Sequence, residues 1–97
     1  MSNPEPKLSI TLQGDLLGHM LRWQTGTTPK AFDALVDRAY DRRVKLKLRT
    51  QVTARLSIRE ATDVWLFVEK THKEEPDERC VANRLMKALE NVRSVYQ

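Results

Sequence analysis

Basic side chains gather in one central segment of the chain. Between positions 42 and 59 the sequence has seven basic residues and no acidic one. The 97-residue chain has a formal net charge of +4, so the rest of it carries −3. The basic residues are Arg42, Arg43, Lys45, Lys47, Arg49, Arg55 and Arg59. Such a local patch suits a polyanion; the alternative is a solvated edge strand protected by its lysines.

The residue types that catalyse reactions or bind metals are few and scattered. The chain has one cysteine, Cys80, and two histidines, His19 and His72, which fall in different expected helices. The sequence contains no CxxC, HxxxH or glycine-rich phosphate loop, whereas metal sites need closely spaced ligands. We therefore predict that the protein is not an enzyme and has no catalytic residues, metal or cofactor. Cys80 begins an apolar helical stripe and is expected to be buried.

Composition and length indicate a single globular domain. Hydrophobic residues make up 40% of the chain and charged residues 31%, which is ordinary for a folded domain. One cysteine excludes an internal disulfide framework and indicates a reducing compartment. The longest apolar run, residues 64–68, is far too short to span a membrane, and we see no secretion signal. We expect a cytoplasmic protein without membrane contact.

Two segments alternate between apolar and polar residues, which is the pattern of a half-buried β-strand. In residues 7–13 the apolar positions are Leu8, Ile10 and Leu12. The polar positions are Lys7, Ser9, Thr11 and Gln13. The second segment alternates from position 44 to position 58, and its core of thirteen residues would span about 43 Å as a strand. Because that is too long for this domain, we expect residues 49–56 to be the paired part and the rest to be a connector or the end of the second helix.

The residues between these segments have helical periodicity. We predict a first helix over residues 15–24, followed by Gly26 as a left-handed residue. The second helix is expected to have Thr28 as its N-cap and Pro29 at its first helical position. Apolar residues on one face of each helix would supply the core, and the aromatic residue Trp23 is assigned to the core rather than to recognition.

Two further helices follow the second alternating segment. Ser57 and Glu60 have the spacing of a capping box and predict the start of the third helix, which should end near residue 72. This helix is expected to bury Trp65 and Leu66. Pro76 predicts the start of the fourth helix.

The predicted order is β-α-α-β-α-α, a mainly α-helical fold with a small two-stranded antiparallel ribbon. Residues 1–6 contain two prolines and are expected to form a flexible arm, and residues 7–97 one domain with units at 7–43 and 44–97. Two antiparallel strands satisfy each other's backbone hydrogen bonds. Their apolar sides would pack on the helices, and their polar sides would form a ribbon of the kind that fits the major groove of B-DNA.

The segment LSITLQGDLL, followed by GTTPKAFDALVDRAY, resembles the ribbon-helix-helix family of DNA-binding proteins, which includes the Met and Arc repressors. The resemblance covers about residues 7–43. It implies that outward strand residues read base edges and that the start of the second helix holds a backbone phosphate. The base-reading residues would be Lys7, Ser9, Thr11 and Gln13, and the phosphate-binding residues would be Thr28 and Lys30.

The second half repeats the same order of elements without clear sequence identity. If it is a second copy, the chain is a single-chain pseudo-dimer, and the readers of its strand are Gln51, Thr53 and Arg55. If it is not, residues 7–43 pair with another chain in a homodimer, and the C-terminal half is an oligomerisation or partner-binding module.

We therefore expect sequence-specific binding of double-stranded DNA by a transcriptional repressor or accessory factor, associated with the nucleoid when bound. Further phosphate contacts would come from Arg42, Arg43, Lys45, Lys47 and Arg49. The alternative function is a protein-binding module, such as an antitoxin or phage-type inhibitor, which would dock through the basic segment and the aromatic-rich third helix.

Overall fold

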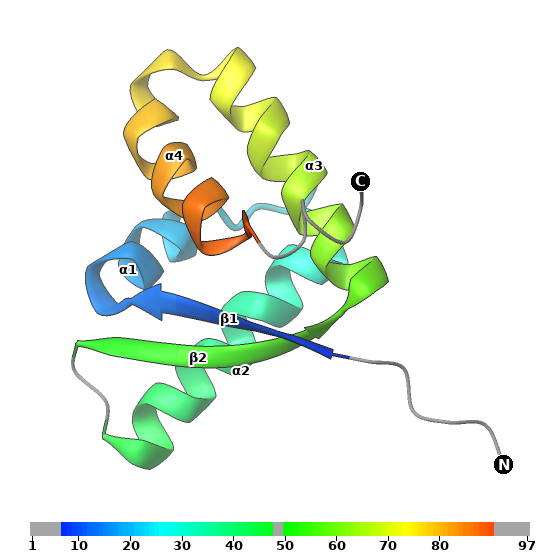
Figure 1. Cartoon of the computed structure of the whole chain (residues 1–97). Helices are drawn as coiled ribbons and strands as arrows, with labels where there is room; N and C mark the ends of the chain where they lie inside the picture. Colours follow the sequence, from blue (N-terminus) through cyan, green and yellow to red (C-terminus); the bar gives the residue numbers. More distant parts are fainter. Residues whose placement is uncertain (1–6, 48–49, 91–97) are drawn as a thin grey trace, which may run out of the picture.

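The two alternating segments form one antiparallel two-stranded sheet, and a pair of helices follows each strand (Figure 1). The computed structural model describes residues 7–47 and 50–90. The elements are β1 (Lys7–Gln13), α1 (Gly14–Trp23), α2 (Lys30–Leu46), β2 (Gln51–Ser57), α3 (Ile58–Glu74), a 3₁₀ turn (Pro76–Glu78) and α4 (Arg79–Ala88). The prediction of a mainly helical chain with a two-stranded antiparallel sheet is confirmed.

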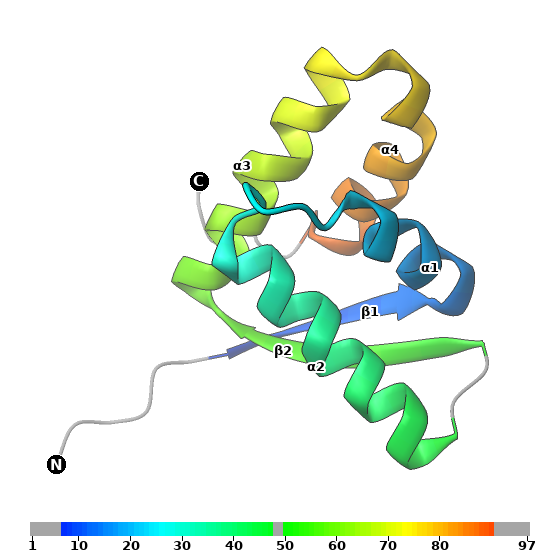
Figure 2. The same cartoon turned by 180° about the vertical axis from the view of Figure 1, so that it is seen from behind.

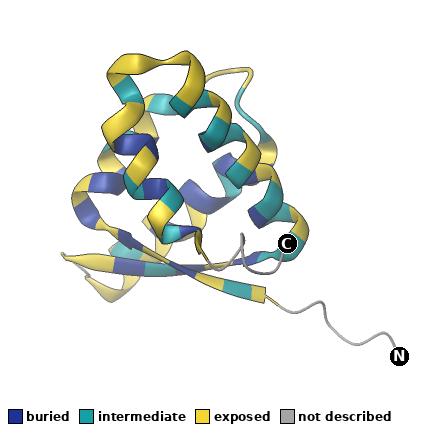
Figure 3. Ribbon diagram, turned by 45° about the horizontal axis from the view of Figure 1, so that its top comes forward, coloured by how far each residue is buried: buried dark blue, intermediate teal, exposed yellow. Residues whose placement is uncertain are grey.

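The sheet has one apolar face and one polar face because side chains alternate along each strand. Lys7 lies opposite Ser57 and Gln13 lies opposite Gln51. The buried positions of the strands are Ile10, Leu12, Val52, Ala54 and Leu56. Figure 3 shows the ribbon along one edge of the molecule, with the helices packed on its apolar face.

Each unit's second helix packs against the strand of the other unit. Helix α2 contacts β2 and α3, and α4 contacts β1 and α1. The two units therefore share one core, in which burial of apolar surface provides the main stabilisation. Pairing of β1 with β2 also completes the ribbon within one chain.

Helix α2 is longer than predicted and includes the start of the second alternating segment. It continues to Leu46, so the expected unit boundary between residues 43 and 44 falls inside the helix. Lys47 ends α2 in the left-handed conformation with a φ of 53°, and its N–H donates to the carbonyls of Arg43 and Val44. The start of the alternating segment is thus the end of the second helix, one of the two interpretations that its length left open, and its apolar side chains Val44 and Leu46 are 64% and 55% exposed.

The turn between α1 and α2 also differs from the prediction. Thr28 does not cap α2, because Pro29 occupies the N-cap position and its carbonyl accepts the N–H groups of Phe32 and Asp33. The Thr28 hydroxyl instead accepts the Thr25 N–H at 2.6 Å within the turn. None of the chain's glycines, all of which are described, has a positive φ, so a left-handed Gly26 is not what ends α1.

Three aromatic rings hold α1, α2 and α3 together. The centroid of the Phe32 ring lies 4.9 Å from the centroid of the Phe67 ring and 6.1 Å from that of the Trp23 ring. The Trp23 indole Nε1 donates to the Glu78 carboxylate at 3.0 Å, which satisfies its polar edge. The assignment of Trp23 to the core agrees with this packing, although the ring is only partly buried.

The second pair of helices corrects three details of the prediction. The capping box at Ser57 and Glu60 is present, but Leu66 is 50% exposed and Trp65 is only partly buried. Pro76 begins a 3₁₀ turn, and α4 starts three residues later. Cys80 is exposed, so its expected burial was wrong: it lies just outside the stripe that α4 buries.

Candidate nucleic-acid interface

The polar side of the ribbon forms a continuous surface, here called the ribbon face. It consists of Lys7, Ser9, Thr11, Gln13, Gln51, Thr53, Arg55 and Ser57. The structure thus brings together all seven residues that the sequence predicted as base readers. Thr53 and Ser57 are partly buried and the other six are exposed.

Cross-strand pairing fixes the arrangement of the ribbon face. Ser9 lies opposite Arg55, and Thr11 lies opposite Thr53. The hydroxyls of Thr11 and Thr53 are hydrogen-bonded at 3.1 Å, a type of pair that stabilises antiparallel strands. These four side chains occupy the middle of the ribbon, where the two strands contribute equally.

The ribbon face has approximate two-fold symmetry. Helix α1 begins at Gly14 and α3 begins at Ile58, 44 residues later. Ile10 and Ala54 are also 44 residues apart, and they are paired across the ribbon. The pseudo-two-fold axis that relates the two units therefore passes through this pair. Arg55 then occupies the position that corresponds to Thr11, so the two halves present similar geometry but different chemistry.

An arginine of α2 clamps the junction between β2 and α3. Arg38 donates from Nη1 to the Arg55 carbonyl and to Glu60 Oε1, both at 3.0 Å, and its Nη2 lies 3.0 Å from Glu60 Oε2. Glu60 also accepts the Ser57 N–H at 3.0 Å. The hydrogen bond from Arg38, helped by the one from Ser57, holds the pKa of Glu60 below its ordinary value.

An arginine of α4 makes the corresponding clamp at the junction between β1 and α1. Arg84 donates from Nη2 to Gln13 Oε1 at 2.8 Å and to Asp15 Oδ1 at 2.9 Å. Hydrogen bonding to Arg84 lowers the pKa of Asp15, and the same contact raises the pKa of Arg84. Both clamps run from one unit to the other, at opposite ends of the ribbon.

The predicted phosphate-binding residues of the basic segment lie on the last turns of α2. They are Arg42, Arg43, Lys45 and Lys47. Lys45 pairs with Asp41 at 3.1 Å, and Arg43 donates to the Gly14 carbonyl at 3.4 Å. Figure 2 shows this end of α2 reaching past the ribbon, beside the start of β2. Arg49 lies outside the described residues.

The other two predicted phosphate ligands are not part of this basic cluster. Thr28 is partly buried and Lys30 is exposed at the opposite end of α2. The turn that contains Thr28 lies against α3, where Thr27 and Pro29 line a hollow of about 610 Å³. Three carboxylates also line it, those of Asp63, Glu74 and Glu75, and they disfavour an anion there.

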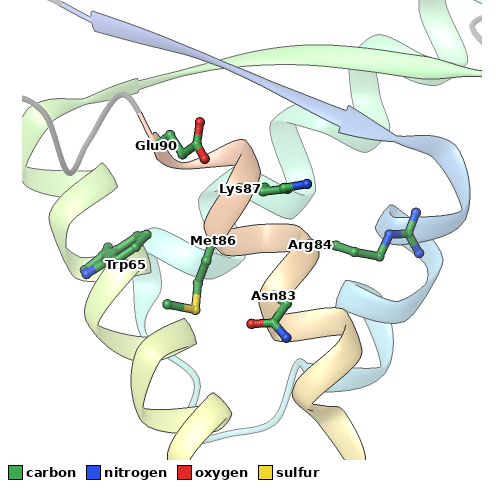
Figure 4. Close-up of a pocket in the computed structure, with 6 residues that line it drawn as sticks. All are labelled: Trp65, Asn83, Arg84, Met86, Lys87 and Glu90. Atoms are coloured by element: carbon green, nitrogen blue, oxygen red, sulfur yellow. The ribbon is translucent and has the colours of Figure 1, made fainter.

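Sequence reasoning missed two cations of α4 beside the ribbon face. Arg84 and Lys87 line a hollow of about 260 Å³ together with Thr11 and Gln13. Figure 4 shows both side chains on α4, on the far side from Trp65 of α3. The sequence places Arg84 and Lys87 next to the buried residues of α4, which indicates that both lie near the core. It does not indicate that they lie beside β1, because local periodicity carries no information on contacts between distant elements.

Within residues 7–47 and 50–90, no three His, Cys, Asp or Glu side chains could jointly hold a metal ion. No helix in the described part of the chain is long and apolar enough to cross a membrane.

No protein-family model, curated protein or solved structure matches this chain.

Proposed function

We propose that the chain binds double-stranded DNA sequence-specifically, as a ribbon-helix-helix protein with both β-α-α units in one polypeptide. It would act as a transcriptional repressor or accessory DNA-binding factor. The observation that supports this most strongly is the ribbon face, a two-stranded antiparallel surface with eight polar side chains in register. A two-stranded ribbon fits the major groove of B-DNA, where base edges are distinguishable.

The side chains of the ribbon face suit base reading. Arginine pairs with the two acceptors of guanine, and glutamine can pair with adenine, while serine and threonine contact several bases. Arg55 is exposed in the middle of β2, and its backbone is held by Arg38. A fixed backbone beneath an exposed arginine lowers the entropy lost when the side chain binds.

The cations of α2 and α4 suit the phosphates that flank a groove. Arg42, Lys45 and Lys47 are exposed at the end of α2, beside β2. Lys87 of α4 lines a hollow together with Thr11 and Gln13 of β1. Contacts of this kind give affinity without sequence information and a strong dependence on salt concentration.

Fluorescence anisotropy with selected and random duplexes tests the proposal. We expect Arg55→Ala or Thr11→Ala to relax sequence preference. Lys45→Ala should weaken binding to all sequences and reduce the slope of log affinity against log salt by about 1. Arg79→Ala is the control for charge, because Arg79 begins α4 and bonds the His72 carbonyl. Absence of duplex binding at low salt would refute the proposal.

A protein partner is the second candidate function, favoured by apolar side chains exposed among the cations of α2. Tyr40 and Val44, one helical turn apart on α2, are 46% and 64% exposed, and exposed apolar groups that gather mark interaction sites. Val44→Asp would abolish retention of a protein partner in a pull-down if this surface docks it. That result, together with no affinity for duplex DNA, would favour the second candidate.

A further inference from the structure

Among the contacts of the described residues, Gln13 is the one base-reading candidate whose side chain is held by a charged group from another element. Arg84 Nη2 donates to its Oε1 at 2.8 Å and to Asp15 Oδ1 at 2.9 Å. Gln13 and Asp15 are 71 and 69 positions from Arg84 in the sequence, so both contacts exist only because the chain folds. Asp15, a carboxylate that is ionised at neutral pH, anchors the guanidinium.

The contact determines which way the Gln13 amide faces. An arginine side chain has only hydrogen-bond donors, so the Gln13 atom that it contacts must be the carbonyl oxygen. The Nε2 amide group then points away from Arg84. Reversing the amide would set N–H groups against a cation, which is unfavourable.

We propose that Arg84 is a positioning residue that makes Gln13 select guanine over adenine. This inference rests on the proposed function. In the major groove guanine presents two acceptors, N7 and O6, whereas adenine presents the acceptor N7 and the donor N6–H₂. Gln13 held by Arg84 offers two N–H donors that suit guanine. One lone pair of its oxygen already accepts from Arg84, so an adenine N6–H₂ group would have to use the second lone pair, beside a positive charge.

The variant Arg84→Met isolates this effect. It frees Oε1 to pair with adenine N6–H₂ while Nε2 donates to N7, which is the usual glutamine–adenine contact. Base preference at the position read by Gln13 should shift toward adenine by roughly fivefold or more, as expected for a bidentate contact. The side chains of Arg84 and Asp15 are 36% and 65% exposed, so loss of their ion pair should leave the fold intact.

Two comparisons separate positioning from simple charge. Lys87→Met removes a cation from the same hollow and should weaken binding to all sequences without changing the base profile. In a Gln13→Ala background, Arg84→Met should no longer change base preference, because the residue that it positions is absent. Circular dichroism at 222 nm and the melting temperature would verify folding of each variant.

Selection from randomised duplexes, followed by sequencing, gives the base profile of every variant in one experiment. The expected result is a change from guanine to adenine at one position in Arg84→Met alone. A uniform loss of affinity with an unchanged profile would overturn the inference and leave the proposed function standing. If the wild-type protein enriches no sequence and binds no duplex, the proposed function fails as well.

Independent NMR of the Gln13 side-chain amide tests the clamp without DNA. The Nε2 group should have a higher order parameter in the wild-type protein than in Arg84→Met. Equal order parameters in the two proteins would overturn the positioning role.

Discussion

Replacement of Glu60 by alanine should destabilise the protein more than its position on the surface would suggest. Glu60 accepts the Ser57 N–H in the capping box and forms two contacts with Arg38, all at 3.0 Å. Loss of a helix cap typically costs about 1 kcal/mol. Loss of a partly exposed ion pair costs about 0.2–1 kcal/mol. The side chains of Arg38 and Glu60 are 44% and 27% exposed, so solvent screens the second contribution.

The expected total is about 1–2 kcal/mol in the free energy of unfolding. In a domain of this size it lowers the melting temperature by about 5–15 °C. Thermal unfolding followed by circular dichroism at pH 7 measures the change. Glu69→Ala is the matched control, because Glu69 lies on the same helix and forms an exposed ion pair with Lys73 at 3.5 Å. That control should change stability by no more than about 0.5 kcal/mol.

The same variant has a predicted pH dependence. The pKa of Glu60 is lower in the folded protein than its ordinary value of 4.5. Its stabilising contribution is therefore complete above the unfolded pKa and is lost as the pH falls through the folded pKa. The difference in stability between wild type and Glu60→Ala should shrink below about pH 4.5. Equal effects of Glu60→Ala and Glu69→Ala at pH 7, or a difference that persists in acid, would refute this reasoning.

Three further predictions concern the core, the exposed thiol and the ribbon. Phe32→Ala should lower the free energy of unfolding by about 3–5 kcal/mol, measured by urea denaturation, because the fully buried ring packs on two other aromatic rings. Cys80 is exposed, so it should react with a thiol reagent in the native protein as fast as in urea; strong protection would contradict its placement. Thr11→Val should abolish the hydrogen bond to Thr53 yet change stability by less than about 1 kcal/mol, measured by thermal unfolding.

The two strands and the start of α3 could be predicted because local sequence determines them. Strict alternation of apolar and polar residues in residues 7–13 predicts a strand with one buried face, and these residues form β1. The capping box of Ser57 and Glu60 defines the start of α3 by hydrogen bonds between near neighbours. For this reason the sequence predicts that the polar residues of each strand share one face, and the strand register brings those of both strands together.

Features that depend on distant contacts could not be predicted in the same way. The length of the second alternating segment indicates that part of it is a connector or a helix end, but local alternation does not give the residue at which α2 ends, which is Leu46. Cys80 directly precedes Val81, the first residue that α4 buries, but its own side chain is exposed. The contact of Arg84 with Gln13 and Asp15 joins residues about 70 positions apart, and no local pattern in the sequence indicates such a contact.

An NMR titration of the backbone amides with a duplex selected by the protein tests the central proposal most directly. If the ribbon face enters the major groove, the largest chemical-shift changes should occur in β1 and β2, centred on Ser9, Thr11, Thr53 and Arg55. Smaller changes should occur at the end of α2 and in α4 near Arg84. Changes confined to the helices, with β1 and β2 unaffected, would contradict the account.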